Sequence, residues 1–261
     1  MTSQPENSQD RYDRQTKFTP FGLDGQQAFA GASALVVGVG GLGSWVSVLL
    51  ARAGVGRLRI VDDDHVELTN IHRQAMYDEK TSTERMVKVD AAAMRLGEIN
   101  SDVCVEKYPV RLGADNINEL ADGMDMIVDG CDNFRTRFII NDYCVKTCMP
   151  WVFAGVVGAE AQVMSVLPGE TMCLRCIYDS PLPPELEPSS VQMGVLGPAV
   201  AAIAGIEAVE AMKILSGRKA DVRRELWKLD MWSNSIQTMA STKSCAHGCP
   251  CCDDRYFEYL M

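Results

Sequence analysis

A turn of four closely spaced glycines constrains the fold of this chain more than any other feature. The apolar run 34–39 predicts a buried strand, and it leads into the sequence Gly38-Val-Gly40-Gly41-Leu-Gly43. A helix is expected to follow from Ser44 to Ala53. A strand, a glycine turn and a helix in this order are typical of nucleotide-binding folds, because the glycines let a phosphate approach the N–H groups at the helix N-terminus.

Strands and helices are expected to alternate beyond this turn. Strands are predicted at 57–61 and 124–128, and further β segments at 151–154 and 161–167. Helices are predicted at 23–30, from a capping box at Thr81 and Glu84 through Leu96, and at 134–147 behind a cap at Asp132 and Asn133. This order implies an α/β fold, a Rossmann-like, doubly wound and mainly parallel sheet with additional C-terminal strands.

One domain is expected over residues 1–261, because a chain that is 47% apolar and 23% charged can bury a sizeable core. Its nucleotide-binding core is expected at about 28–167. The remainder, about 168–261, is expected to hold a crossover loop rich in proline and glycine, an apolar interface helix at 199–215, the C-terminal strands and a zinc site.

Charge and hydropathy exclude several classes of protein. A net charge of −10 argues against a general nucleic-acid or anionic-membrane surface, so any bound anion needs a local site. The chain has no charge-free apolar run of about 18 residues, and its first segment is polar rather than signal-like. We therefore expect a soluble protein of the cytoplasm that binds no membrane.

An acidic residue, Asp62, closes the strand after the glycine turn at about the interval typical of a dinucleotide-binding fingerprint. Its carboxylate could accept hydrogen bonds from a ribose. A tight strand–helix turn without a ligand is the simpler alternative. An NAD-dependent oxidoreductase is another alternative, but it needs a hydride acceptor and a proton donor, and no such constellation is evident around His65, His72 or His247.

Cations follow the acidic turn. Asn70 and Arg73 lie three residues apart, Lys88 comes next, and Asp132 follows a later strand end. The carboxyl ends of parallel strands meet at one crevice, so these side chains could gather there with Asp62. Two cations, Arg73 and Lys88, and a carboxylate that can hold Mg²⁺, Asp132, are the groups that a reaction at a phosphate requires. Taken singly, Lys88 could instead pair with a glutamate on its own helix, Asn70 and Asp132 could be helix caps, and Arg73 a surface charge.

Two Cys-x-x-Cys pairs, Cys173 with Cys176 and Cys249 with Cys252, have the spacing of a four-thiolate zinc site. Reduced bystander thiols or a redox dithiol are the alternatives. Cys245 and Cys251 stand beside the second pair, and either could replace one of its ligands.

In their order, these motifs resemble the ThiF/MoeB/HesA family, the bacterial relatives of ubiquitin-activating enzymes. The resemblance covers nearly the whole chain and rests on Arg11-Tyr-Asp-Arg14-Gln15, the glycine turn, Asp62-x-Asp64, Asn70-x-x-Arg73-Gln74, Lys88, Cys131-Asp132-Asn133, the two cysteine pairs and Gly194-Val-Leu-Gly-Pro198.

The resemblance implies ATP-dependent adenylylation of a small β-grasp sulfur-carrier or ubiquitin-like protein at its Gly-Gly terminus, with release of pyrophosphate. It implies that Asp62 holds the ribose, that Asp132 binds Mg²⁺, and that Arg14 reaches the triphosphate from the partner subunit of a homodimer. The implied catalytic residues are Arg14, Arg73, Lys88 and Asp132. The implied nucleotide-binding residues are Gly38, Gly40, Gly41, Gly43, Asp62, Asp64, Asn70, Arg73, Gln74, Lys88, Asp132 and Asn133.

Other expectations concern the wider reaction. Some members of the family carry a cysteine where this chain has Ser190, so a covalent link to the carrier is not expected there. The chain ends without a rhodanese domain, which implies a separate sulfur donor in thiamin, molybdopterin or related biosynthesis. Alternatives to the adenylyltransferase are a tRNA-modifying dehydratase of the same superfamily, the NAD-dependent oxidoreductase and an inactive nucleotide-binding scaffold.

Overall fold

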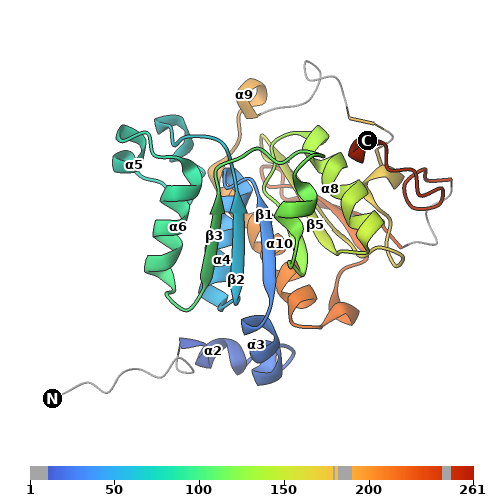
Figure 1. Ribbon diagram of the computed structural model, residues 1–261, viewed down its shortest axis with the longest axis horizontal. Helices are drawn as coiled ribbons and strands as arrows, with labels where there is room; N and C mark the ends of the chain where they lie inside the picture. Colours follow the sequence, from blue (N-terminus) through green and yellow to red (C-terminus); the bar gives the residue numbers. More distant parts are fainter. Residues whose placement is uncertain (1–10, 179, 182–189, 243–247) are drawn as a thin grey trace.

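A computed structural model describes residues 11–178, 180–181, 190–242 and 248–261. Its central element is a sheet of eight strands in the order β3-β2-β1-β4-β5-β6-β7-β8 (Figure 1). The strands are β1 (Ser33–Val37), β2 (Arg57–Val61), β3 (Cys104–Tyr108), β4 (Met126–Asp129), β5 (Trp151–Val157), β6 (Glu160–Val166), β7 (Glu225–Asp230) and β8 (Ser235–Ala240).

The sheet confirms the expected doubly wound topology. Strands β3, β2, β1, β4 and β5 run parallel to one another, whereas β6, β7 and β8 continue the sheet from β5 in antiparallel pairing. The chain leaves β1 toward β2 on one side and later returns to β4 on the other. This reversal of strand order opens a crevice at the carboxyl end of β1, which is where ligands bind in such sheets.

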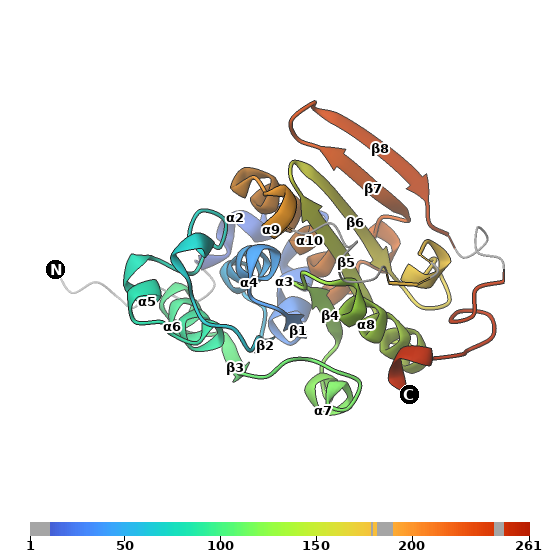
Figure 2. The ribbon, with the colours of Figure 1, turned by 90° about the horizontal axis from the view of Figure 1, so that it is seen from above.

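Helices cover both faces of the sheet (Figure 2). Along β1, Ala34 and Val36 point into one apolar cluster and Leu35 and Val37 into the other. The first cluster includes residues of α3 (Gly22–Ala30), α4 (Gly41–Ala53), α6 (Lys88–Ile99) and α10 (Gly197–Leu215), and the second includes residues of α7 (Ile117–Ala121) and α8 (Phe134–Thr147). The short helices are α2 (Asp13–Thr16), α5 (Glu79–Thr83) and α9 (Ser190–Met193). Burial on both faces explains the nearly continuous apolar run of the central strand β1, whose five residues are all buried.

The capping box predicted at Thr81 and Glu84 was wrong. The N-cap of α5 is Asp78, whose side chain accepts from the Thr81 backbone N–H at 2.8 Å. The chain then turns at Arg85, whose φ is +49°, and α6 begins only at Lys88. By contrast, Asn133 caps α8 as expected, since its side chain accepts from the Thr136 N–H at 2.9 Å.

The C-terminal part of the chain packs on α8. The ring of Tyr259 lies 4.9 Å from that of Phe138, and the guanidinium of Arg175 lies over the same tyrosine at 5.2 Å. Helix α10 contributes a carboxyl group, Glu207, that is wholly buried beneath the sheet. No helix among the described residues is both long and apolar enough to span a bilayer.

Candidate functional site

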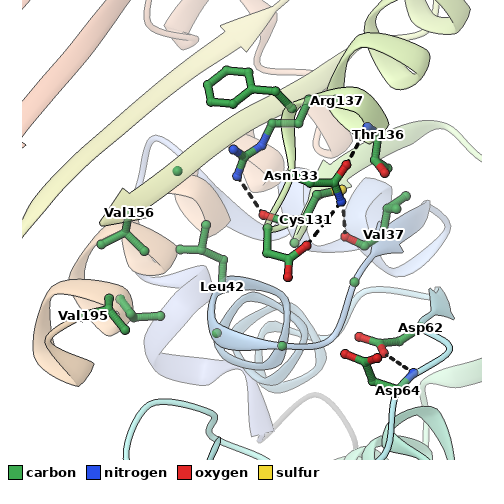
Figure 3. A pocket seen from close by; sticks show the side chains of 18 of the residues that line it. Val37, Leu42, Asp62, Asp64, Cys131, Asn133, Thr136, Arg137, Val156 and Val195 are labelled. Atoms are coloured by element: carbon green, nitrogen blue, oxygen red, sulfur yellow. Dashed lines mark hydrogen bonds between the residues drawn. The ribbon is translucent and has the colours of Figure 1, made fainter. Parts of the chain in front are cut away.

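A cavity of about 690 Å³ opens at the carboxyl ends of the parallel strands, beside the glycine turn. It gathers residues that the sequence scatters over more than ninety positions. Among the predicted site residues, those that line it are Gly38, Gly40, Gly41, Asp62, Asp64, Asn70, Arg73, Gln74, Lys88, Asp132 and Asn133. Figure 3 shows Asp62 and Asp64 at one end of this cavity and Asn133 and Arg137 at the other.

The glycine turn passes so close to a second loop that side chains would not fit. A Cβ on Gly38, whose φ is +83°, would lie 2.6 Å from the carbonyl oxygen of Gly130 at the end of β4. Gly43 is absent from the cavity wall: a Cβ there would lie 1.8 Å from the Gly38 carbonyl oxygen. Gly43 therefore lets α4 pack on its own turn, as the third glycine of such fingerprints does. The sequence prediction missed Gly130, although a glycine directly after a strand was a signal for it.

Asp62 closes one end of the cavity and is tied to the turn. Its Oδ2 accepts from the Val39 backbone N–H at 2.8 Å and its Oδ1 from the Asp64 N–H at 2.9 Å. Burial raises the pKa of the Asp62 carboxyl, and the charge of Lys88 opposes that rise. The carboxylate is thus fixed beside the glycine backbone, where its remaining lone pairs can accept from a ribose.

Lys88 reaches the cavity from the first residue of α6. Its side chain is 8% exposed, and its Nζ lies 2.7 Å from Asp64 Oδ2, on a carboxylate that is 66% exposed. The alternative that Lys88 pairs on a solvated helix face was wrong, because α6 begins at Lys88 itself. The Asp64 carboxylate thus supplies the buried ammonium group of Lys88 with an acidic partner.

The segment after Asp62 presents an amide and a second cation. Asn70 Oδ1 accepts from the Glu67 N–H at 3.0 Å, so this residue does cap a short 3-10 turn while lining the cavity. Arg73 is half-buried, and its Nη1 donates to the Thr69 carbonyl at 2.6 Å. Gln74 is buried, and its Oε1 has no hydrogen-bond partner among the described residues. An unpartnered buried oxygen beside a cavity is a group that a ligand could satisfy.

The loop after β4 supplies the opposite wall. Asp132 is exposed to the cavity, and one of its oxygens accepts from the Asn133 side-chain amide at 3.2 Å. Its carboxylate is therefore free to take a divalent cation. Arg137 also lines this wall, and sequence reasoning missed it because an arginine one turn into a helix gives no sign of burial.

Arg14 lies elsewhere in the molecule. It is on α2, at the amino-terminal edge of the sheet in Figure 1, and does not line the cavity of its own chain. Its side chain is 93% exposed, and among the described residues its ion pair is with the neighbouring Asp13, at 3.9 Å.

A second site gathers four cysteines between a turn at Leu174–Cys176 and the C-terminal segment. Three pairs of Sγ atoms lie 3.8 Å apart: those of Cys173 with Cys249, Cys173 with Cys176, and Cys176 with Cys252. A disulfide would require about 2.05 Å, whereas a tetrahedral ion with metal–sulfur bonds of about 2.3 Å separates its sulfurs by about 3.8 Å. Hydrogen bonds from the neighbouring thiols, first that of Cys173, lower the pKa of Cys249, which favours a thiolate. These four residues fit a metal ion.

The other two candidate ligands stand outside this cluster or outside the described residues. Cys251 is fully buried but directs its sulfur toward Asn141, whose Nδ2 lies 3.4 Å away. Cys245 is outside the described residues, and so are His247 and the side chain of Ser190.

The chain is similar to known proteins over nearly its whole length. Residues 12–251 match the model of the ThiF family. The chain is 36% identical over 250 residues to a sulfur carrier protein ThiS adenylyltransferase of Bacillus subtilis, covering 96% of this chain and 73% of that protein. It is 37% identical over 250 residues to a sulfur carrier protein adenylyltransferase of Thermus thermophilus, covering 94% of this chain and 91% of the relative.

A longer relative and two solved structures extend the comparison. An adenylyltransferase and sulfurtransferase MOCS3 of Culex quinquefasciatus is 36% identical over 251 residues, and the chain spans 57% of its length. Escherichia coli MccB bound to ATP superimposes with a TM-score of 0.78 at 22% identity, covering 95% of this chain and 75% of that one. MccB with N-formylated MccA gives 0.81, also at 22% identity, covering 95% and 77%. These two structures share the fold of this chain.

Proposed function

The chain belongs to the ThiF family, and from that premise we propose that it is an adenylyltransferase. Its substrates are ATP and the C-terminal glycine carboxylate of a small β-grasp sulfur-carrier or ubiquitin-like protein. One observation carries the proposal: a single cavity beside the glycine turn brings together Lys88, Arg73, Asn70 and two separate carboxylates, Asp62 and Asp132. Relatives named as sulfur-carrier adenylyltransferases over most of this chain's length support the choice of substrate.

The reaction joins two anions, which defines what the cavity must do. A carboxylate oxygen of the carrier attacks the α-phosphorus of ATP, the bond between that phosphorus and the bridging oxygen breaks, and pyrophosphate leaves with the electron pair. Negative charge grows on the leaving group. Fixed cations such as Lys88 and Arg73 therefore stabilise the transition state more than the ground state. No nucleophilic side chain is needed.

The ribose and the phosphates of the nucleotide are assigned to different parts of the cavity wall. Asp62, fixed by the Val39 and Asp64 N–H groups, accepts the ribose hydroxyls. The phosphates lie over Gly40 and Gly41 at the N-terminus of α4, where unpaired backbone N–H groups favour an anion. Asp132 would hold Mg²⁺, which would neutralise phosphate charge when bound.

Two further parts of the molecule complete the proposal. The four clustered cysteines, Cys173, Cys176, Cys249 and Cys252, would hold a structural Zn²⁺ that joins two segments far apart in the sequence. Arg14, remote from its own cavity, would be supplied to the triphosphate of the partner subunit in a homodimer. Both ATP and reduced thiolates fit a cytoplasmic enzyme, and sulfur would be added to the adenylylated carrier by a separate donor.

The proposal is tested by incubating the protein with ATP, Mg²⁺ and candidate carriers, and measuring the carrier mass. We expect one carrier ending in Gly-Gly to gain one AMP, with one pyrophosphate released for each. The same carrier with a C-terminal amide is the matched control, because it keeps the docking surface but lacks the attacking oxygen. Transfer of AMP to no carrier, or to the amide as well, would contradict the proposal.

A further inference from the structure

A buried arginine outside the predicted site forms part of the cavity wall. Arg137 is 6% exposed, and two of its three nitrogens are committed to the protein. Its Nε donates to Asp129 Oδ2 at 2.7 Å, and its Nη2 donates to the carbonyls of Cys131 at 2.7 Å and Ala154 at 2.8 Å. The third nitrogen, Nη1, makes no hydrogen bond to any residue that the structure describes.

The surroundings fix the plane of this guanidinium. The rings of Phe134 and Phe153 each lie 5.3 Å from it, measured from Cζ to the ring centroid. Asp129, with no exposed surface, neutralises its charge and holds its inner edge. The Arg137 side chain is therefore preorganised, so a ligand that used Nη1 would lose little entropy in ordering it.

A glycine gives the cavity access to Nη1. Gly155 on β5 lines the cavity, and a Cβ built there would lie 3.6 Å from both Nη1 and Nη2 of Arg137 and 3.8 Å from its Cζ. A hydrogen-bonding oxygen would need to approach Nη1 to about 2.9 Å. A side chain at residue 155 would therefore begin against the guanidinium and crowd a ligand bound to Nη1, whereas glycine leaves this space open.

We propose that Nη1 of Arg137 binds the terminal carboxylate of the carrier protein, which passes over Gly155. This inference rests on the proposed function. Figure 3 shows Arg137 at the end of the cavity opposite Asp62, so a carboxylate on Nη1 and a ribose on Asp62 would leave the α-phosphate between them. One carboxylate oxygen would accept from Nη1, and the other would remain free to attack phosphorus.

The ion pair with Asp129 favours a role for Arg137 in orienting the substrate carboxylate rather than in neutralising its charge. The Asp129 carboxylate already offsets the charge of Arg137, so the substrate meets directed N–H donors rather than an unpaired cation. Such donors orient a carboxylate without strongly lowering its nucleophilicity. Lys88 and Arg73, which lie elsewhere on the wall, are left to serve the phosphates.

The test leaves the arginine intact. Removing Arg137 would strand the buried Asp129 and could prevent folding, so we use Gly155→Ala, whose methyl group is in ordinary contact distance of the guanidinium. The matched control is Gly97→Ala on α6, because a Cβ there meets nothing within 4 Å and Gly97 does not line the cavity. The readouts are the KM values for carrier and ATP, and the dissociation constants of the carrier in its free-acid and C-terminal amide forms.

For the wild type and Gly97→Ala, we expect the free acid to bind about tenfold more tightly than the amide, as one hydrogen bond to a charged group warrants. Gly155→Ala should abolish this preference and raise KM for the carrier about tenfold, with KM for ATP unchanged. An undiminished preference in Gly155→Ala, with an active wild type, would overturn this inference alone. AMP transfer to no carrier by the wild type would overturn the proposed function and this inference with it.

Discussion

The Nζ of Lys88 lies 2.7 Å from Asp64 Oδ2, at the point where α6 enters the cavity. The same two residues are joined through their backbones, because the Lys88 N–H donates to the Asp64 carbonyl at 2.8 Å. Asp64 thus holds the buried lysine in place before any phosphate binds. A triphosphate would take over the ammonium group, leaving the more exposed Asp64 carboxylate to turn toward solvent.

Removing this cation should slow the chemistry. We expect Lys88→Ala to reduce kcat/KM for adenylylation by roughly 10²–10³, the usual cost of deleting one fixed charge-stabilising donor. Lys80→Ala, on the exposed α5 and outside the cavity wall, is the matched control and should retain full activity. The measurement is ATP–pyrophosphate exchange in the presence of the carrier. Wild-type exchange in Lys88→Ala would remove this lysine from the site.

The second cation tests the same electrostatic argument from another segment. Arg73→Ala should also lower exchange by roughly 10²–10³, because its guanidinium faces the same cavity. Arg95→Ala provides the control, since Arg95 pairs with Glu98 on the exposed face of α6. Equal rates for the two variants would mean that Arg73 is only a surface charge.

The four-cysteine cluster should hold zinc and stabilise the fold. We expect Cys176→Ser to lose bound zinc, as measured by elemental analysis, and to lower the melting temperature by roughly 10 °C or more, because the metal joins two distant segments. Cys104→Ser, at an exposed cysteine on β3, should keep both properties. Full zinc content in Cys176→Ser would contradict the assigned ligand set.

Asn141 on α8 bridges the two chain segments that carry the clustered cysteines, through residues that neighbour the four ligands. Its Oδ1 accepts from the Leu174 N–H at 2.8 Å, and its Nδ2 lies 3.4 Å from the sulfur of Cys251. Asn141→Ala should weaken zinc binding by about 10–100-fold, which is typical for residues that orient metal ligands. Competition with a zinc chelator measures this. An unchanged zinc affinity would show that the two segments need no support from α8.

The buried carboxyl group of Glu207 should make the stability of the fold depend on pH. Burial, followed by the nearby charge of Asp129, raises the pKa of the Glu207 carboxyl well above its usual value of 4.5. In the unfolded chain the Glu207 carboxyl loses its proton near pH 4.5, whereas in the folded chain it keeps the proton to a higher pH. The free energy of unfolding therefore falls as the pH rises from about 4.5 toward the pKa of the folded state.

Glu207→Gln removes that proton while keeping the shape of the side chain. Relative to this variant, the wild type should lose up to about 1.4 kcal/mol of unfolding free energy for each pH unit within that window. Urea unfolding between pH 5 and 8 measures the difference, with Glu119→Gln on the exposed face of α7 as the control. A difference that does not change with pH would contradict the raised pKa.

Local patterns were enough to predict the nucleotide-binding half of the fold. The glycine turn, the cap at Asn133 and the spacing of the cysteines are short-range signals, and each predicts one local structure. Strand β3 was not predicted, and β7 and β8 were expected only as C-terminal strands without bounds. The edge strands Cys104–Tyr108 and Ser235–Ala240 lack a continuous apolar run that would mark them. The cap at Asp78 was missed because the positive φ of Arg85, which separates two helices, leaves no mark in the sequence.

The site shows the same division between local and distant signals. Asp62 and Asp132 could be predicted because each follows a strand end. Lys88 was predicted from its order among the family motifs, since the helix that it begins was expected to start earlier, at Thr81. Arg137 could not be predicted, since its partners Asp129 and Ala154 come from two other strands that only the folded sheet brings beside α8.

The most direct test of carrier adenylylation follows the phosphorus atoms of ATP. The protein is incubated with its carrier and with ATP labelled at either the α- or the γ-phosphate, and the label on the carrier is measured. For an adenylyltransferase, we expect the α-label to be transferred to the carrier and the γ-label to leave in pyrophosphate. A carrier labelled from the γ-phosphate, or from neither, would contradict the proposed function.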